Sequence, residues 1–99
     1  MHDNQDGDPL FFKLCSDHLS VEAIPRSRLR IDFVKMKMTL EAEYQVLMWT
    51  PYFVVLKSVV GVEEITLRRD GRMIIRKAVS EERARLEGRR LLDLLIAKS

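Results

Sequence analysis

The sequence predicts an α+β protein with a mostly antiparallel sheet and helices packed on one face of that sheet. Apolar and polar residues alternate from Val34 onward, which is typical of a strand with one buried face. Asp70-Gly71 lies between two short apolar runs and is a strong hairpin signal. The segment after Ser80 has the apolar spacing of an amphipathic helix.

The chain divides into three parts. Residues 1–8 hold no apolar anchor and are expected to form a disordered acidic tail. Residues 9–28 are expected to form an appendage and a linker. Residues 29–99 are expected to form one domain, with the element order strand, helix, strand, strand, helix.

A short helix is predicted at the start of the appendage. Asp8 has the chemistry of an N-cap and Pro9 suits the first helical position, so we expect a helix that runs to about His18. Pro25 and the run Arg26-Ser27-Arg28 end any such structure and are interpreted as the linker.

The alternating segment is predicted to be a strand from Leu29 to Met38 that continues through Val46. An alternative is a helix from Thr39 to Trp49, because its apolar residues also fit helical spacing. Thr50-Pro51 then repeats the cap-and-proline signal, so Pro51 to Val60 is predicted to be a short buried helix. The β-branched residues of that segment keep a strand open as an alternative.

The hairpin around Gly71 is predicted to have a three-residue loop. This register pairs Ile65 with Ile75 and Leu67 with Met73, and it requires a positive φ at Gly71. The same register sets two pairs of opposite charge side by side, Glu63 with Lys77 and Glu64 with Arg76.

The C-terminal helix is predicted to begin at Ser80, with Glu81 and Glu82 in its first turn and Lys98 near its end. Its buried face is expected to consist of Ala84, Gly88, Leu91, Leu92 and Leu95. Because Leu86 and Leu94 lie outside this stripe, we also expect a homo-oligomer.

The run Asp70-Gly71-Arg72-Met73-Ile74-Ile75-Arg76-Lys77-Ala78-Val79-Ser80-Glu81-Glu82 and the helix to Leu95 resemble the hairpin and long helix that close each half-repeat of TATA-binding proteins. The resemblance covers about a quarter of the chain and one half-repeat only. The phenylalanine pairs with which that family wedges DNA are not matched. The resemblance therefore implies the local fold of residues 70–95.

Composition indicates a small globular protein. The 99 residues are 46% hydrophobic, and no run approaches the length of a membrane span. The single cysteine, Cys15, excludes an intrachain disulfide, and the acidic N-terminus lacks the features of a secretory signal, so we expect a cytoplasmic protein without a membrane partner. Asparagine and glutamine are scarce, as in heat-adapted proteins.

No catalytic residue, metal ligand or cofactor site is predicted. Cys15, Asp17 and His18 offer three donors within one turn, but a structural zinc needs four, and His2 in the acidic tail is the only further histidine. Glu41 and Glu43 are interpreted as solvated charges beside lysines. No glycine-rich phosphate loop occurs. Trp49, Tyr52 and Phe53 are assigned to the core, with stacking on a flat ligand as the alternative.

A basic binding face is predicted on the side of the sheet that the helices leave open. If Val34, Met36 and Met38 face the core, alternation sends a set of basic and apolar residues to the other side. This predicted binding face consists of Phe33, Lys35, Lys37, Arg68, Arg72, Ile74 and Arg76. We expect a non-enzymatic protein that binds an anionic partner there, with nucleic acid as the first candidate. The alternatives are a protein-interaction or ligand-sensing accessory subunit, and a small enzyme.

Overall fold

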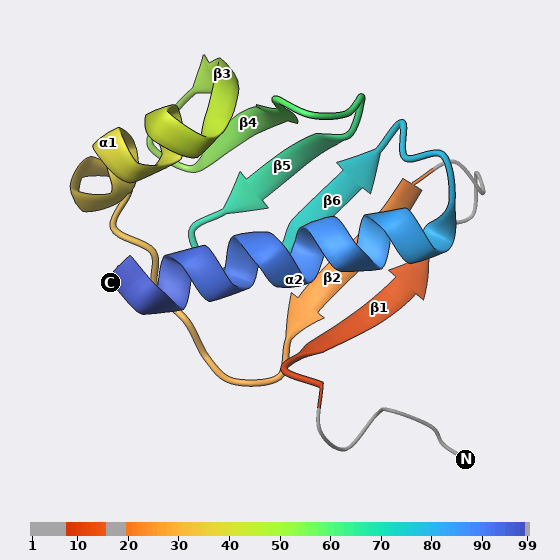
Figure 1. Ribbon diagram of the computed structural model, residues 1–99. Coiled ribbons are helices and arrows are strands. Elements are labelled where there is room, and N and C mark those ends of the chain that lie inside the picture. Colours follow the sequence, from red (N-terminus) through yellow and green to blue (C-terminus); the bar gives the residue numbers. More distant parts are fainter. Residues whose placement is uncertain (1–7, 16–19, 99) are drawn as a thin grey trace.

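The computed structural model describes residues 8–15 and 20–98. In chain order the elements are β1 (Leu10–Leu14), β2 (Ser20–Pro25), α1 (Phe33–Glu43), β3 (Tyr44–Trp49), β4 (Phe53–Ser58), β5 (Glu64–Arg68), β6 (Met73–Arg76) and α2 (Glu81–Lys98) (Figure 1). The strands form one six-stranded sheet in the order β1-β2-β6-β5-β4-β3, and every neighbouring pair is antiparallel.

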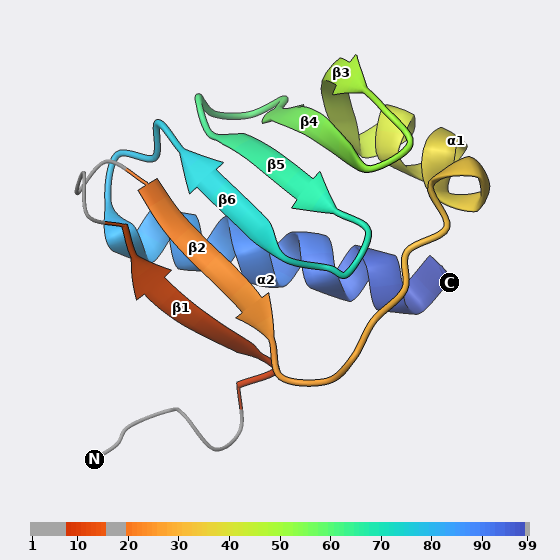
Figure 2. The same ribbon diagram turned by 180° about the vertical axis from the view of Figure 1, so that it is seen from behind.

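The helices leave one face of this sheet uncovered. In Figure 1 α2 crosses the sheet in front of β1, β2 and β6, and in Figure 2 it lies behind them. At the other end, α1 contacts β3 and α2. The core between the layers is formed mainly by Val54, Leu56, Ile65, Leu67, Met73, Ile75, Leu91, Leu92 and Leu95. The predicted α+β class with a mostly antiparallel sheet is therefore confirmed, although several elements differ from the prediction.

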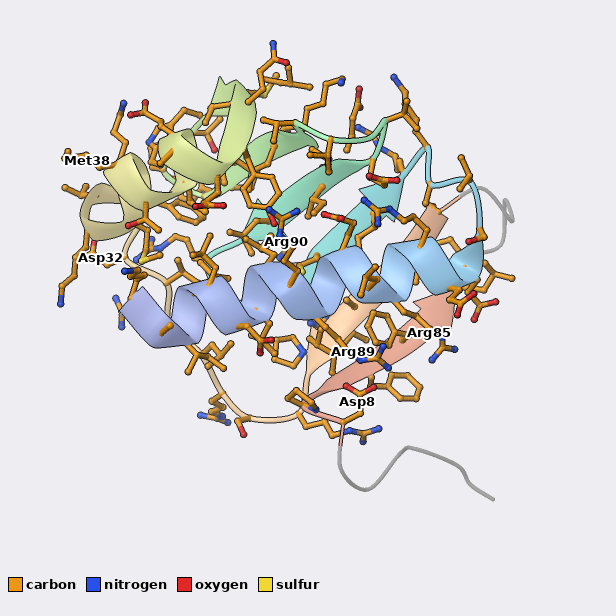
Figure 3. The ribbon with its side chains drawn as sticks, viewed as in Figure 1. Asp8, Asp32, Met38, Arg85, Arg89 and Arg90 are labelled. Carbon is orange, nitrogen blue, oxygen red and sulfur yellow. The ribbon has the colours of Figure 1, made fainter. Side chains whose placement is uncertain are left out.

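The prediction of a helix after Asp8 is wrong, because Leu10–Leu14 is the edge strand β1. The Asp8 side chain does cap a backbone amide, accepting from Leu10 N at 3.0 Å, but the chain then extends. It also accepts from Arg89 Nη2 of α2 at 2.6 Å (Figure 3). Asp8 is therefore anchored rather than part of a free tail.

Residues 9–28, expected to be an appendage, supply two strands of the sheet, and β2 lies inside it between β1 and β6. Its inward residues Val21 and Ala23 are buried. The run is too short and too rich in small residues to show a clear period, so its sequence gave little indication of a strand. The end of the predicted helix at His18 falls outside the described residues.

The strand predicted from Leu29 to Met38 is also wrong. Residues 33–43 form α1, because Asp32 accepts from Lys35 N as the N-cap and Phe33, Met36 and Leu40 then share one buried face. The alternation at even positions includes Val34 and Met38, which are 85% and 83% exposed. The predicted continuation of the strand through Val46 is correct only from Tyr44, where β3 begins. The alternative, a helix from Thr39 to Trp49, is correct only as far as Glu43, where α1 ends.

The helix predicted for Pro51–Val60 is a strand, β4, as its β-branched residues allowed. Thr50 does not cap a helix. Its Oγ1 accepts from Phe53 N at 2.9 Å and donates to Phe53 O at 2.7 Å, which closes the turn between β3 and β4. Val54 and Leu56 then face the core, and Phe53 and Val55 face the open side.

The hairpin prediction is confirmed. Ile65 pairs with Ile75 and Leu67 with Met73, and Gly71 has a φ of 89°. Glu64 lies opposite Arg76 as expected. The predicted neighbours Glu63 and Lys77 make other bonds: Lys77 Nζ donates to Glu64 at 2.9 Å, and Glu63 accepts from Arg83.

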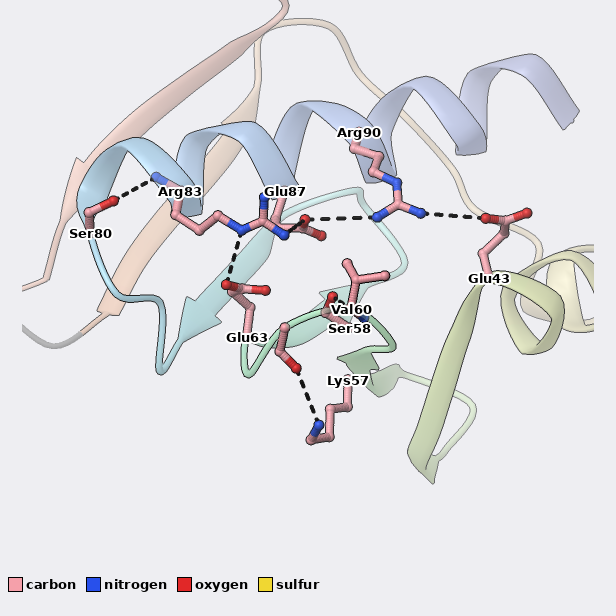
Figure 4. Close-up of polar contacts among 10 residues, drawn as sticks. Glu43, Lys57, Ser58, Val60, Glu63, Ser80, Arg83, Glu87 and Arg90 are labelled. Carbon is pink, nitrogen blue, oxygen red and sulfur yellow. Dashed lines mark hydrogen bonds and ion pairs between the residues drawn. The ribbon is translucent and has the colours of Figure 1, made fainter.

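The C-terminal helix is confirmed, with Ser80 Oγ accepting from Arg83 N and the predicted leucines, Ala84 and Gly88 buried. Leu86 is exposed, whereas Leu94 packs against the core. The helix also buries Glu87. Figure 4 shows the resulting network: Arg83 bridges buried Glu63 (3.1 Å) and Glu87 (2.8 Å), and Arg90 bridges Glu87 and Glu43.

Candidate functional site

The uncovered face of the sheet is built from the alternate residues of its central strands. Register places Ile74 of β6, Thr66 of β5 and Val55 of β4 in one mainly apolar row across it. A second row, at the end of the sheet near the β5–β6 turn, holds Arg72, Arg68 and Phe53. A third row, at the opposite end, holds Arg76, Glu64 and Lys57.

Four residues of the predicted binding face lie here and three do not. Arg68, Arg72, Ile74 and Arg76 project from the uncovered face, and all four are exposed. Phe33, Lys35 and Lys37 belong to α1, because that segment is a helix. The predicted stacking residue Phe33 is buried, and its ring packs edge-on against Trp49 at 5.8 Å. The face therefore lacks the lysines and the aromatic ring assigned to it.

Acidic neighbours neutralise part of this face. Glu64 lies 3.6 Å from Arg76 and 2.9 Å from Lys77. The hydrogen bond from Lys77, together with the charges of Lys77, Arg76 and Lys57, holds the pKa of Glu64 below its ordinary value. Glu64 therefore stays ionised at neutral pH and neutralises one of the two positive charges, Arg76 and Lys57, of the third row.

Positive charge gathers instead where the segment between β2 and α1 meets the β5–β6 turn. Figure 2 shows this segment passing beside the tip of the β5–β6 hairpin. We call this surface the arginine end, defined as Arg26, Arg28 and Arg30 from the segment and Arg68, Arg69 and Arg72 from the hairpin. Only Arg68 and Arg72 belonged to the predicted face.

The side chains of three of these arginines, Arg28, Arg30 and Arg69, make neither an ion pair nor a hydrogen bond with the residues that the structure describes, and all three are exposed. The others are engaged. Arg26 donates to the backbone oxygen of Asp8 at 2.9 Å. Arg68 lies 3.2 Å from Asp70, and Arg72 lies 4.0 Å from both Asp70 and Glu22. The arginine end therefore has three guanidinium groups that are free to meet an outside anion.

Shallow hollows connect the arginines with aromatic side chains. Arg68 and Arg69 line one hollow with Tyr52 and Phe53. Arg69 also lines the next hollow, together with Arg30. Tyr52 is 73% exposed and Phe53 half-buried, so both rings are accessible. The prediction that Tyr52 belongs to the core is therefore wrong, and the alternative role of Tyr52 and Phe53, stacking on a flat ligand, stays a prediction.

Local packing holds the two halves of the arginine end together. Ile31 N donates to Arg69 O at 2.7 Å. Gly71 lets the chain approach closely, because a Cβ at this position would lie 2.8 Å from Leu29 Cδ1 and 3.0 Å from Pro25 Cγ. Residues about 40 positions apart in the sequence thus form one surface.

The other candidate groups do not assemble into a reactive centre. In the described part of the chain, no group of three or more histidine, cysteine, aspartate or glutamate side chains is placed to hold a metal ion. Cys15 is half-buried, and Asp17 and His18 lie outside the described residues. Glu41 pairs with Lys37 at 2.5 Å and Glu43 with Arg90 at 3.6 Å. Neither described helix has the length and apolar character of a membrane span.

The chain matches no family model, no curated protein and no solved structure. The resemblance of residues 70–95 to a TATA-binding half-repeat therefore stays a prediction. The chemistry of the arginine end is the observation from which a function follows.

Proposed function

We propose that the protein is a non-enzymatic nucleic-acid-binding protein that holds a strand at the arginine end. The observation that carries this proposal is the set of three exposed arginines, Arg28, Arg30 and Arg69, that lack acidic partners. A guanidinium group presents a planar fork of donors that suits phosphate oxygens. Because no intramolecular ion pair must break first, the full attraction of these groups is available to a phosphate backbone.

The accessible aromatic rings favour a nucleic acid over a simple polyanion. Tyr52 and Phe53 share a hollow with Arg68 and Arg69, so a base stacked on a ring would bring its phosphate close to a guanidinium group. Thr66 and Asp70 in the same hollow supply polar groups for a base edge. This combination suits an unpaired strand, whose bases are free to turn outward.

TATA-binding proteins, whose half-repeat residues 70–95 resemble in local fold, are a known case of DNA binding by a sheet. The partner, however, would meet a different part of this surface. Here Arg28 and Arg30 lie in the segment that joins β2 to α1, and Arg69 lies in the β5–β6 turn beside it.

Fluorescence anisotropy with a labelled single-stranded oligonucleotide at low salt tests the proposal. Arg30→Gln/Arg69→Gln should weaken binding by about tenfold or more, which corresponds to about 1.4 kcal/mol. Tyr52→Ala should weaken it by a similar factor if one base stacks there, at about 1–3 kcal/mol per base.

Arg76→Gln is the matched control. It removes one arginine from the same uncovered face, but Arg76 is paired with Glu64. Its effect should therefore be the smaller one. Equal losses in the two variants, or no measurable binding by the parent protein, would refute the arginine end as the site.

A further inference from the structure

The end of the sheet at β3 is an unprotected edge. Among the described strands β3 pairs with β4 alone. Its sequence, Tyr-Gln-Val-Leu-Met-Trp, carries no charged residue and no proline. Natural sheets usually protect their edges with such residues, because a free apolar edge pairs with other chains. A bulge can also protect an edge, and the bulge between Val46 and Met48 is the one protective feature of this strand.

Free backbone groups point outward from this edge. Ser58 N donates to Glu63 O, so the backbone groups of Ser58 face β5. Because antiparallel ladders alternate, Lys57 then pairs with Gln45, and the N–H and C=O of Val46 face away from β4. Leu47 and Met48 are also 44% and 51% exposed. The edge therefore offers both hydrogen-bonding groups and apolar surface.

The outer side of α1 continues this surface. Val34, Met38 and Ala42 are spaced four residues apart and lie in one exposed stripe. Figure 3 shows Met38 on the side of α1 that points away from α2. The helix adjoins β3, since Lys37 Nζ lies 5.5 Å from the centre of the Trp49 ring and Val34 lines the same hollow as Trp49.

We propose that a second copy of this chain covers the surface formed by β3 and α1. A two-fold axis perpendicular to the sheet would pair β3 with β3 in antiparallel fashion and set α1 antiparallel to α1 on the same side. The surface must then be complementary to itself. This interface adjoins the arginine end, because Val34 lines the same hollow as Arg30 and Arg69, but it does not include Leu86, the exposed leucine of α2.

Charge along α1 supplies that complementarity. With Met38 facing Met38 of the second copy, antiparallel helices bring Val34 opposite Ala42 and Lys35 opposite Glu41. Lys35 has no acidic partner among the described residues, so it is free to meet Glu41 of the other chain. The basic first half and acidic second half of α1 favour this antiparallel arrangement over a parallel one.

A charge exchange tests the proposal by sedimentation analysis. The parent protein should be a dimer at high micromolar concentration. Lys35→Glu alone and Glu41→Lys alone each place like charges opposite one another twice, so each should dimerise about tenfold more weakly. An equimolar mixture of the two variants should recover the parent's association, because each contact then joins opposite charges.

Val34→Glu/Met38→Glu should be monomeric with unchanged circular dichroism, because both side chains are exposed. If that variant unfolds, the charge-exchange variants Lys35→Glu and Glu41→Lys still test whether the chain dimerises through α1. Hydrogen exchange at Val46 N–H gives an independent measurement: the amide should be protected at high parent concentration and exposed in the monomeric variant. A parent that stays monomeric, or a mixture that associates no better than its components, would overturn the proposal.

Discussion

The backbone N–H of Ile31 donates to the carbonyl oxygen of Arg69 at 2.7 Å. This bond ties the segment between β2 and α1 to the tip of the β5–β6 hairpin, and it sets Arg30 and Arg69 on one hollow. The arginine end therefore depends on a backbone contact between distant parts of the chain. Changes that separate these parts should disturb both stability and binding.

Gly71→Ala should show this dependence. Alanine is disfavoured at a φ of 89°, and its Cβ would lie 2.8 Å from Leu29 Cδ1. We expect a loss of about 2 kcal/mol or more in the free energy of unfolding, measured by chemical denaturation. In Gly71→Ala/Leu29→Ala the clash with Leu29 Cδ1 is removed, but the close contact with Pro25 Cγ and the backbone strain stay. The double variant should therefore lose less than the sum of the single variants, and strictly additive losses would contradict this packing.

The buried network makes Arg83 the most sensitive ion-pair residue of α2. Its guanidinium bridges Glu63 and Glu87, whose side chains are 3% and 1% exposed. Arg83→Met would leave buried carboxylate charge uncompensated, and we expect a loss of about 3 kcal/mol. Arg85→Met is the control, because Arg85 pairs with exposed Glu81 and should cost under about 1 kcal/mol. Similar losses in urea denaturation would contradict the assignment.

Asp8 should make stability depend on acid pH. Burial raises the pKa of Asp8. Hydrogen bonds from Arg89 and Leu10 N, together with the charges of Arg89 and Arg26, lower this pKa by more than burial raises it, so it lies below the ordinary value of 3.8. The folded state therefore favours the carboxylate, and its contribution is present above pH 3.8 and lost as pH falls through the lowered pKa.

Asp8→Asn should accordingly be less stable than the parent by about 1–2 kcal/mol at neutral pH. The difference should shrink as the pH falls below 3.8 and through the lowered pKa of Asp8, where the carboxylate of the folded parent becomes protonated. Denaturation curves of both proteins across this range give the measurement. A difference that is independent of pH would show that the ion pair with Arg89 is not its source.

Tyr44 should limit stability in alkali. Burial, and the nearby charge of Glu87, raise the pKa of Tyr44 to about 12. The folded state thus holds this proton more tightly than the unfolded chain, so stability falls as pH rises from the ordinary value of 10.0 towards 12. Tyr44→Phe should reduce this loss at little cost at neutral pH, because the hydroxyl is buried without a partner among the described residues. An unchanged alkaline transition would contradict this role.

The elements predicted correctly are those in which several local signals agree. At Gly71 the turn residues, the apolar pairs and the charge pairs favour one register, and after Ser80 the cap, the charges and the apolar spacing favour one helix. In residues 33–43 the signals conflict. The spacing of Met36 and Leu40 fits both the two-residue period of a strand and the 3.6-residue period of a helix. Val34 and Met38 are exposed, so not every apolar residue of this segment belongs to the core. Asp32 before Phe33 was the available helix signal.

The candidate site was less accessible to sequence reasoning than the fold. Arg26-Ser27-Arg28 has the composition of a linker, and its sequence does not indicate that it packs on a turn some 40 residues later. The contact depends on Gly71 and on the bond between Ile31 and Arg69, which are tertiary features. Likewise, only the side-chain positions show that Arg69 lacks a partner while Arg76 has one.

The salt dependence of single-strand binding tests the central claim most directly. Each phosphate contact made by the arginine end should add about 0.7 to the slope of log K against log salt concentration. Arg30→Gln/Arg69→Gln should therefore reduce the magnitude of the parent's slope by about 1.4, so that binding depends less on salt. Arg76→Gln should reduce the magnitude of the slope by less than about 0.7. A parent affinity that does not change with salt, or a slope that the double variant leaves unchanged, would contradict the account.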